Sequence, residues 1–260
     1  MADPNRTAAF DLTGHVALVT GGNGGIGLGM ARGLAEAGAD VAIWGTNAEK
    51  NERAAKELES IGSGKVLALQ CDVGDEEQVD ASMAATIDAL GKVDSCFANA
   101  GIGAGAPIQD MTLDLWRRVH RIDSDGVFLT YRAAVRHMIE RGEGGRLVGI
   151  SSSSAIHGAA RNIAYAHSKT GMLGMTRALA VELARYGITA NSILPGWIET
   201  DMTQGAFGYQ KFVDNVMPRI PQRRWGQPDD FGGIAVYLAS AASAYHTGDA
   251  FVIDGGYTIF

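Results

Sequence analysis

The stretch HVALVTGGNGGIGLGMARGL, residues 15–34, predicts how the chain begins to fold. Residues 15–20 read as a buried β-strand, and five glycines follow within residues 21–27. Ile26, Met30 and Leu34 then recur at the spacing of one helical face. A glycine-rich turn between a strand and a helix lets backbone N–H groups and the positive helix end face a pyrophosphate. The stretch therefore predicts a dinucleotide-binding βα unit, with a tight turn that binds no ligand as the alternative.

The glycines of this turn fit two spacings equally well. The pattern G-x-G-x-x-G is matched by Gly22, Gly24 and Gly27. The pattern T-G-x-x-x-G-x-G is matched by Gly21, Gly25 and Gly27. Because so many glycines stand together, the sequence leaves both registers open.

Apolar runs typical of buried strands alternate with helical patterns along the rest of the chain. The further strand candidates are VAIWG, KVLALQ, VDSCFAN, GRLVGIS, ITANSI and AFVID, at 41–45, 65–70, 93–99, 145–151, 188–193 and 250–254. Helices are expected over 48–60, 112–140 and 163–186. This alternation predicts an α/β fold, a doubly wound parallel sheet of about seven strands with helices on both faces. Residues 1–260 are expected to form one domain, in which the proline-broken segment 200–225 is a mobile substrate loop.

Composition excludes several classes of partner. The chain has 260 residues, of which 46% are apolar, and its net charge is −7 without any block rich in Lys and Arg. These features argue against nucleic acid or an anionic membrane as the main partner. No apolar stretch is long enough for a membrane span, and MADPNRTAAF at the start lacks the apolar run of a signal peptide. Cys71 and Cys96 lack the spacing of metal ligands, so we expect buried thiols, no metal site and a cytoplasmic location.

The end of the second strand should carry the residue that distinguishes NAD from NADP. The chain reads Gly45-Thr46-Asn47 there, so no carboxylate is placed to hold a ribose 2′-hydroxyl and no arginine to bind a 2′-phosphate. Thr46 and Asn47 could hydrogen-bond either species, and Lys50 adds positive charge. We expect NAD(P) as the cofactor, with NADP slightly favoured over NAD.

Several motifs, in this order and at these separations, resemble the short-chain dehydrogenase/reductase family over essentially the whole chain. They are TGGNGGIG at 20–27, CDV at 71–73, ANAG at 98–101, Tyr165-Ala166-His167-Ser168-Lys169 as Y-x-x-x-K, and LPGWIETDM at 194–202. The resemblance implies a single Rossmann domain and an NAD(P)-dependent oxidoreductase that interconverts a secondary alcohol and a ketone. It also implies cofactor contacts at Gly21, Asn23, Gly25, Ile26, Gly27, Thr46, Asn47, Asp72, Val73, Asn99, Ala100, Gly101, Tyr165, Lys169, Pro195, Gly196, Ile198 and Thr200.

The resemblance implies catalytic roles for Ser152, Tyr165 and Lys169. The family's serine lies 13 residues before its tyrosine, which selects Ser152 from the four serines at 151–154. An ammonium group one helical turn from a phenol, with the charge of an oxidised nicotinamide, favours the phenolate as general base. Ser152 would then hydrogen-bond the reacting oxygen. Lys169 would also bind the nicotinamide ribose.

One expected catalytic position departs from the family pattern. Where the family usually has V-N-x-x-G, the chain has Ile122-Asp123-Ser124-Asp125-Gly126. The family's asparagine is thought to act largely through its main-chain carbonyl, which holds a water near the lysine, so Asp123 could serve with little loss. Its carboxylate would add negative charge near Lys169 and favour the charged lysine. A neutral substitution is the alternative.

Other functions and details stay open at this point. A non-catalytic NAD(P)-binding sensor or scaffold and a sugar-nucleotide epimerase are the alternatives to a dehydrogenase. The substrate is expected to be a small alcohol or carbonyl compound, with most similarity to polyol and sugar dehydrogenases, and relatives of this kind are commonly homotetramers. The remaining candidates for the substrate pocket are Ile102, His157, Trp197 and Phe207.

Overall fold

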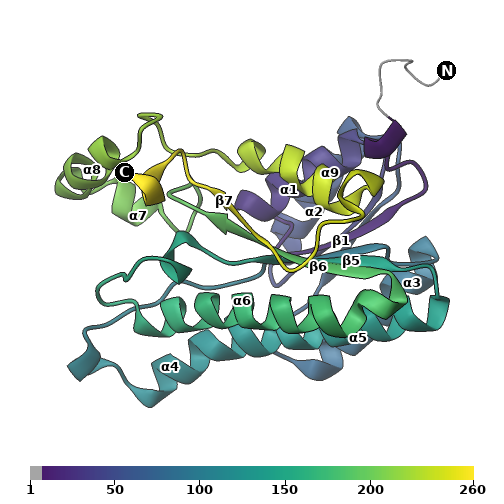
Figure 1. The fold of residues 1–260 in the computed structure, drawn as a ribbon, viewed down its shortest axis with the longest axis horizontal. Coiled ribbons are helices and arrows are strands. Elements are labelled where there is room, and N and C mark those ends of the chain that lie inside the picture. The colour runs from purple at the N-terminus through teal and green to yellow at the C-terminus, as the bar shows by residue number, and fades with distance from the viewer. Residues whose placement is uncertain (1–7) are drawn as a thin grey trace.

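A seven-stranded parallel sheet forms the centre of the computed structural model, which describes residues 8–260 (Figure 1). The strand order is β3-β2-β1-β4-β5-β6-β7. The strands are β1 (Val16–Thr20), β2 (Asp40–Gly45), β3 (Val66–Gln70), β4 (Ser95–Ala98), β5 (Gly145–Ile150), β6 (Ile188–Pro195) and β7 (Ala250–Ile253). The chain reverses its direction across the sheet between β1 and β4, which creates a crevice at the carboxyl ends of these strands. The predicted doubly wound sheet is confirmed; residues 1–7, on which the expected lack of a signal peptide partly rests, lie outside the described residues.

Helices cover both faces of the sheet. On one face lie α1 (Gly25–Glu36), α2 (Ala48–Ile61) and α9 (Gly232–Ala239), and on the other lie α3 (Glu76–Leu90), α4 (Leu113–His120), α5 (Gly126–Arg141) and α6 (Ile163–Leu183) (Figure 1). Two short helices, α7 (Gln204–Phe207) and α8 (Gln210–Val216), stand apart at one end of the molecule. Within the described residues, no helix is long and apolar enough to cross a membrane.

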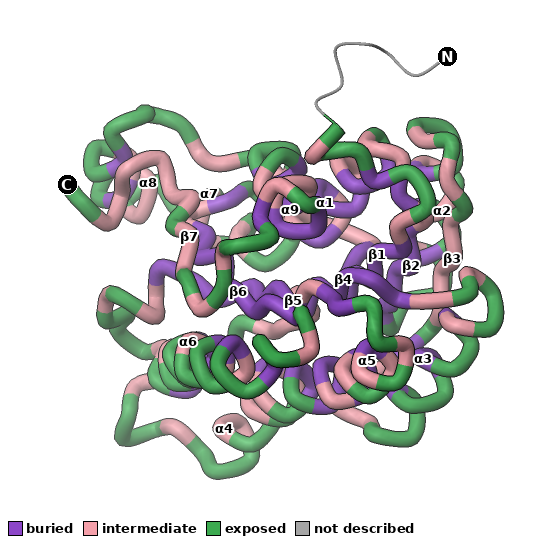
Figure 2. Tube along the Cα trace, turned by 45° about the vertical axis from the view of Figure 1, so that its right-hand side comes forward, coloured by how far each residue is buried: buried purple, intermediate pink, exposed green. Residues whose placement is uncertain are grey.

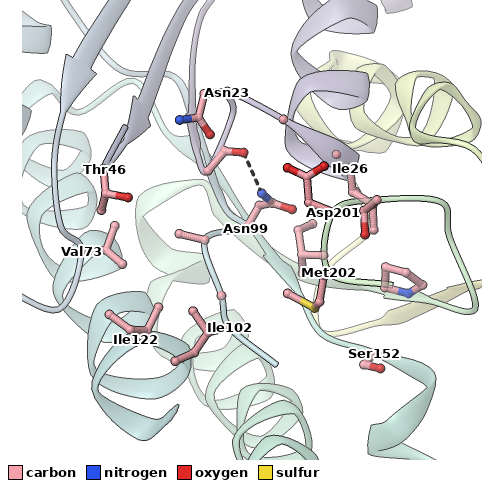
Figure 3. Close-up of a pocket in the computed structure, with 18 of the residues that line it drawn as sticks. Asn23, Ile26, Thr46, Val73, Asn99, Ile102, Ile122, Ser152, Asp201 and Met202 are labelled. Carbon is pink, nitrogen blue, oxygen red and sulfur yellow. Dashed lines mark hydrogen bonds between the residues drawn. The ribbon is translucent and has the colours of Figure 1, made fainter. Parts of the chain in front are cut away.

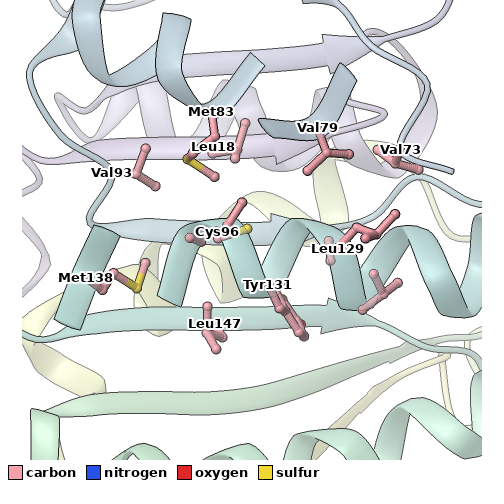
Figure 4. Packing of buried hydrophobic residues seen from close by; sticks show 14 of the residues in the cluster. Leu18, Val73, Val79, Met83, Val93, Cys96, Leu129, Tyr131, Met138 and Leu147 are labelled. Atoms are coloured by element: carbon pink, nitrogen blue, oxygen red, sulfur yellow. The ribbon is translucent and has the colours of Figure 1, made fainter. Parts of the chain in front are cut away.

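Two apolar cores lie on the two faces because successive strand residues point to opposite sides. In β1, Leu18 joins the core under α3, α5 and α6, whereas Ala17 and Val19 join the core under α1, α2 and α9. Figure 4 shows the first core, in which Cys96 and Tyr131 pack with aliphatic side chains between sheet and helices. The inner strands are buried along their length, while the edge strands β3 and β7 are only partly covered (Figure 2).

Three predicted segments differ in detail from the observed elements. The expected helix 112–140 consists of α4 and α5 joined by a π-helical turn, Arg121–Asp125. The expected helix 163–186 ends as α6 at Leu183 and continues as one 3-10 turn. The segment 200–225, expected to be a substrate loop, contains α7, α8 and a further 3-10 turn.

Candidate active site

A cavity of about 480 Å³ lies at the carboxyl ends of the central strands. Its walls come from the glycine turn after β1, from the ends of β2 to β6, and from the start of α6 (Figure 3). Ligands of doubly wound sheets bind at this edge, where the chain direction reverses. The cavity is therefore where the predicted site residues should meet.

The glycine turn has the backbone conformation of the T-G-x-x-x-G-x-G register. Gly21 and Gly25 have φ angles of 64° and 51°, which side-chain-bearing residues rarely adopt. A Cβ at Gly27 would lie 2.3 Å from the Gly21 carbonyl oxygen, whereas a Cβ at Gly24 would meet nothing within 4 Å. The turn thus resolves the two open registers in favour of Gly21, Gly25 and Gly27. It also leaves backbone N–H groups at the N-terminus of α1 open to an anion, as a dinucleotide pyrophosphate requires.

Asn99 braces the glycine turn against the end of β4. Its side-chain amide donates to the Thr20 carbonyl at 2.9 Å and to the Gly21 carbonyl at 3.3 Å. The Thr20 hydroxyl accepts from the backbone N–H groups of Asn99 and Ala100, each at 3.0 Å. Figure 3 shows Asn99 beside the glycine turn. Asn99 and Ala100, which both line the cavity, are thereby held in place. These hydrogen bonds satisfy the polar groups of Thr20 and Asn99, which are largely shielded from solvent.

The two residues at the end of β2 lie differently. Thr46 is exposed and lines the cavity, together with Lys50. Asn47 does not line the cavity, and its side-chain oxygen caps α2 by accepting from the Lys50 N–H at 2.8 Å. The Lys50 ammonium lies 2.6 Å from the Asp201 carboxylate, across the mouth of the cavity.

The carboxylate of Asp72 is held by protein groups. Oδ2 forms an ion pair with Arg121 at 2.9 Å, and Oδ1 accepts from the Gly74 N–H at 2.9 Å. Asp72 and the buried Val73 both line the cavity. The ion pair of Asp72 with Arg121 was not predicted. Arg118 and Arg121 both line the cavity. Their spacing of three residues in a helical segment could have indicated that both face the same side.

Tyr165 and Lys169 lie one turn apart on α6, and both line the cavity. The Lys169 ammonium is 5.4 Å from the centre of the Tyr165 ring. It is almost fully buried and donates to the Ile150 carbonyl at 3.0 Å. The buried cation is therefore held beside the phenol by the end of β5.

The serine run after β5 divides into different roles. Ser151 donates its hydroxyl to the Lys169 carbonyl at 2.7 Å, which ties the end of β5 to α6. Ser152 accepts from the Ser154 N–H at 3.0 Å, so its own O–H remains free to donate (Figure 3). Both serines line the cavity.

Asp123 lies behind Lys169 rather than in the cavity wall. Asp123 is the one buried residue of the π-helical turn that contains it, and its exposed fraction is 1%. Its Oδ1 accepts from the Ile102 N–H at 2.8 Å, and its Oδ2 lies 3.5 Å from the Lys169 ammonium. Burial raises the pKa of the Asp123 carboxyl, while the Lys169 ammonium acts to lower it.

The cavity brings together most of the predicted residues. Those that line it are Gly21, Asn23, Gly25, Ile26, Thr46, Asp72, Val73, Asn99, Ala100, Gly101, Ser152, Tyr165, Lys169, Pro195, Gly196, Ile198 and Thr200. Gly27, Asn47 and Asp123 lie outside its lining, and of the further pocket candidates only Ile102 reaches it. Residues 8–260 contain no group of side chains arranged to hold a metal ion.

Comparison with known proteins gives close matches over nearly the whole chain. Residues 21–258 match the family described as enoyl-(acyl carrier protein) reductase. A 2-dehydro-3-deoxy-D-gluconate 5-dehydrogenase of Dickeya dadantii is 36% identical over 95% of this chain and 97% of its own. A short-chain type dehydrogenase/reductase from Mycobacterium marinum superposes with a TM-score of 0.91 at 38% identity, covering 96% of this chain and 98% of its own.

A second solved structure carries ligands. The gluconate 5-dehydrogenase from Burkholderia cenocepacia, in complex with NADP and tartrate, has a TM-score of 0.92 at 36% identity, with 97% of this chain and 98% of its own covered. The Dickeya dadantii and Burkholderia cenocepacia proteins are both named as dehydrogenases.

Proposed function

Because the chain belongs to the short-chain dehydrogenase/reductase family and is an NAD(P)-dependent oxidoreductase interconverting secondary alcohols and ketones, we propose that Tyr165 is its general acid and base. The observation that carries the proposal is the position of Tyr165, Lys169 and Ser152 in one cavity wall, beside the glycine turn. Dehydrogenase relatives favour this activity over a cofactor sensor or an epimerase.

In the oxidation direction, Tyr165 accepts the proton of the substrate hydroxyl as the C–H bond is broken. The nicotinamide, when bound, supplies the acceptor for the hydride. Ser152 donates its free O–H to the same substrate oxygen and stabilises the alkoxide character that develops there. The Lys169 ammonium, fixed by Ile150, favours the phenolate form of Tyr165. In the reduction direction, the phenol returns the proton to the carbonyl oxygen.

The cofactor is proposed to lie along the cavity from the glycine turn to Lys169. Thr46 and Lys50 would meet the 2′ group of the adenosine ribose. We favour a 2′-phosphate because no carboxylate follows β2 and because Lys50 could exchange its partner Asp201 for the phosphate. Asn47 is proposed to contribute through its backbone, since its side chain caps α2. The comparison structure with NADP supports this preference.

The substrate class that we propose is a small polyhydroxy acid. A deoxy-gluconate dehydrogenase and a gluconate dehydrogenase are among the similar proteins. We propose further that α7 and α8, within 200–225, form a movable substrate loop of the single domain. Met202 and Thr203 at its start line the cavity, so movement of the segment would alter the substrate end.

The assembly is proposed to be a cytoplasmic homotetramer. The long helices α5 and α6 run side by side on one face and expose Phe128 and Val181, and the C-terminal Ile259 and Phe260 are also exposed (Figure 1). Apolar side chains of this kind are suited to symmetric contacts. Light scattering on the purified protein would show about four times the mass of one 27.3 kDa chain.

Absorbance of reduced nicotinamide tests the proposed activity directly. D-gluconate, 2-dehydro-3-deoxy-D-gluconate and plain secondary alcohols are each mixed with NADP⁺ or NAD⁺, and the corresponding ketones with the reduced cofactors. We expect turnover with a sugar acid and a higher kcat/KM with NADP⁺. Turnover of plain alcohols alone would refute the substrate class, and no turnover of any compound would refute the activity.

A further inference from the structure

Asp123 is a buried carboxylate with an unused acceptor position. Both of its partners are donors, namely the Ile102 N–H at Oδ1 and the Lys169 ammonium 3.5 Å from Oδ2. Oδ2 is buried and has no hydrogen-bond partner among the described residues. Burying a charged carboxylate costs free energy unless a group of opposite charge lies nearby. The Lys169 ammonium is the group that offsets this cost for Asp123.

The backbone around Asp123 keeps the two charges close. A π-helical turn, in which one extra residue is accommodated, often occurs at functional positions. A Cβ at Gly101 would lie 3.3 Å from both the Asp123 Oδ2 and the Lys169 Nζ, so a larger residue there would crowd the pair. Lys169 is thus held by the Ile150 carbonyl on one side and the Asp123 carboxylate on the other.

Both carboxylate oxygens of Asp123 face donors, the Ile102 N–H and the Lys169 ammonium. The asparagine usual at this position in the family would present one oxygen and one NH₂ group instead. The carboxylate brings a negative charge beside Lys169 that an amide lacks.

We propose that Asp123 is a positioning residue whose carboxylate is the fixed counter-charge of Lys169, and that it moves the working pH of Tyr165 to a more alkaline range. Lys169 favours the phenolate of Tyr165, and a neighbouring negative charge cancels part of that effect. The proposal rests on Tyr165 being the general base. The other titratable group whose charge acts on Asp123 is His120 of α4.

Ionisation of Tyr165 can be measured without substrate or cofactor. Tyrosinate absorbance is titrated in the full-length protein, and subtraction of the Tyr165→Phe titration isolates this residue from the other six of the seven tyrosines. The same subtraction is made in the Asp123→Asn background. We expect the midpoint to be roughly one pH unit lower in Asp123→Asn. An equal or higher midpoint would overturn the proposal.

Kinetics provide the second readout. The pH profile of kcat/KM for alcohol oxidation should move down by the same amount in Asp123→Asn, with a lower plateau because Lys169 is less firmly held. In Asp123→Ala, added formate should move the midpoint back toward the wild-type value. A lower plateau at an unmoved pH midpoint would mean a structural role only. If the wild-type enzyme shows no turnover, the proposed function fails, and the tyrosinate titration still decides the role of Asp123.

Discussion

At the scale of single residues, the chemistry available to the site depends on which polar side-chain atoms are not already hydrogen-bonded within the protein. Ser151 and Ser152 adjoin in the chain, yet the hydroxyl of Ser151 is bonded to the Lys169 carbonyl while the O–H of Ser152 has no acceptor among its described contacts. Tyr165 and Lys169 line the same cavity, and the Lys169 ammonium lies 5.4 Å from the centre of the Tyr165 ring. In the proposed mechanism, proton transfer depends on the phenol hydroxyl of Tyr165.

Replacement of Tyr165 by Phe removes only that hydroxyl. We expect turnover to fall by about 10³-fold, within the usual range for loss of a general acid or base, while cofactor affinity stays within about threefold. Steady-state kinetics and fluorescence titration with reduced cofactor measure the two quantities. Tyr186→Phe, a change in the 3-10 turn after α6, serves as the matched control and should keep full activity. Full activity of Tyr165→Phe would reject the acid–base role.

Cofactor choice is argued at the turn after β2. Thr46→Arg places a guanidinium where a 2′-phosphate is proposed, so the ratio of kcat/KM for NADP⁺ to that for NAD⁺ should rise at least tenfold, or about 1.4 kcal/mol. Thr46→Asp should lower the ratio by repulsion. Initial rates with both cofactors check these expectations. Ratios that do not change in either variant would show that this turn is not the selector.

At the scale of elements, most of the fold could be predicted because local patterns specify it. Buried parallel strands are continuous apolar runs, and all seven strand candidates correspond to observed strands. The π-helical turn between α4 and α5 could not be predicted, because its residues have ordinary helical periodicity. The glycine register also required the φ angles.

Helices α1 and α9 approach each other through glycines. A Cβ at Gly33 of α1 would lie 2.6 Å from the Gly232 Cα, which is backbone and cannot turn aside. At Gly233, the next residue of α9, a Cβ would meet nothing within 4 Å. Both glycines have a helical backbone, but only Gly33 is closely packed. Substituting each by alanine therefore distinguishes the effect of packing on stability from the effect of helix propensity.

Gly33→Ala should lower the free energy of unfolding by about 2 kcal/mol or more, since the helices must move apart. Gly233→Ala should instead raise it by about 0.5–1 kcal/mol, as expected for alanine in an open helical position. Urea unfolding monitored by circular dichroism measures both. A Gly33→Ala variant as stable as the wild type would contradict the close helix contact.

At the scale of the whole molecule, the two ends of the parallel sheet carry different chemistry. The carboxyl ends line the cavity, and the amino ends of β1, β4 and β5 surround a charged cluster. Asp94 accepts from the Val16 N–H at 2.8 Å and pairs with Arg141 at 2.7 Å and Lys92 at 3.1 Å. His15, which precedes β1, is bonded to the Ser95 hydroxyl at 3.0 Å beside this cluster. Because this cluster lies at the end of the sheet opposite the cavity, we expect changes in it to affect stability.

Protonation of His15 should couple the stability of the fold to pH. Burial lowers the pKa of His15 to about 4 from 6.5, because desolvation outweighs the attraction of Asp94, and the nearby cations lower it further. Between pH 6.5 and pH 4, His15 is therefore protonated in the unfolded chain but neutral in the folded one. The free energy of unfolding is unaffected by His15 above pH 6.5 and decreases as the pH falls toward 4. Between pH 7 and pH 5 the loss should be on the order of 2 kcal/mol.

The variant His15→Gln tests this coupling because glutamine keeps a polar contact with Ser95 and does not titrate. Its unfolding free energy should fall less steeply than that of the wild type between pH 7 and pH 5, and the two slopes should coincide between pH 7 and pH 8. Urea unfolding at each pH, with the protein concentration held constant, gives the comparison. Parallel curves across the whole range would mean that the fold accommodates a charged His15, and that its acid sensitivity arises from other groups.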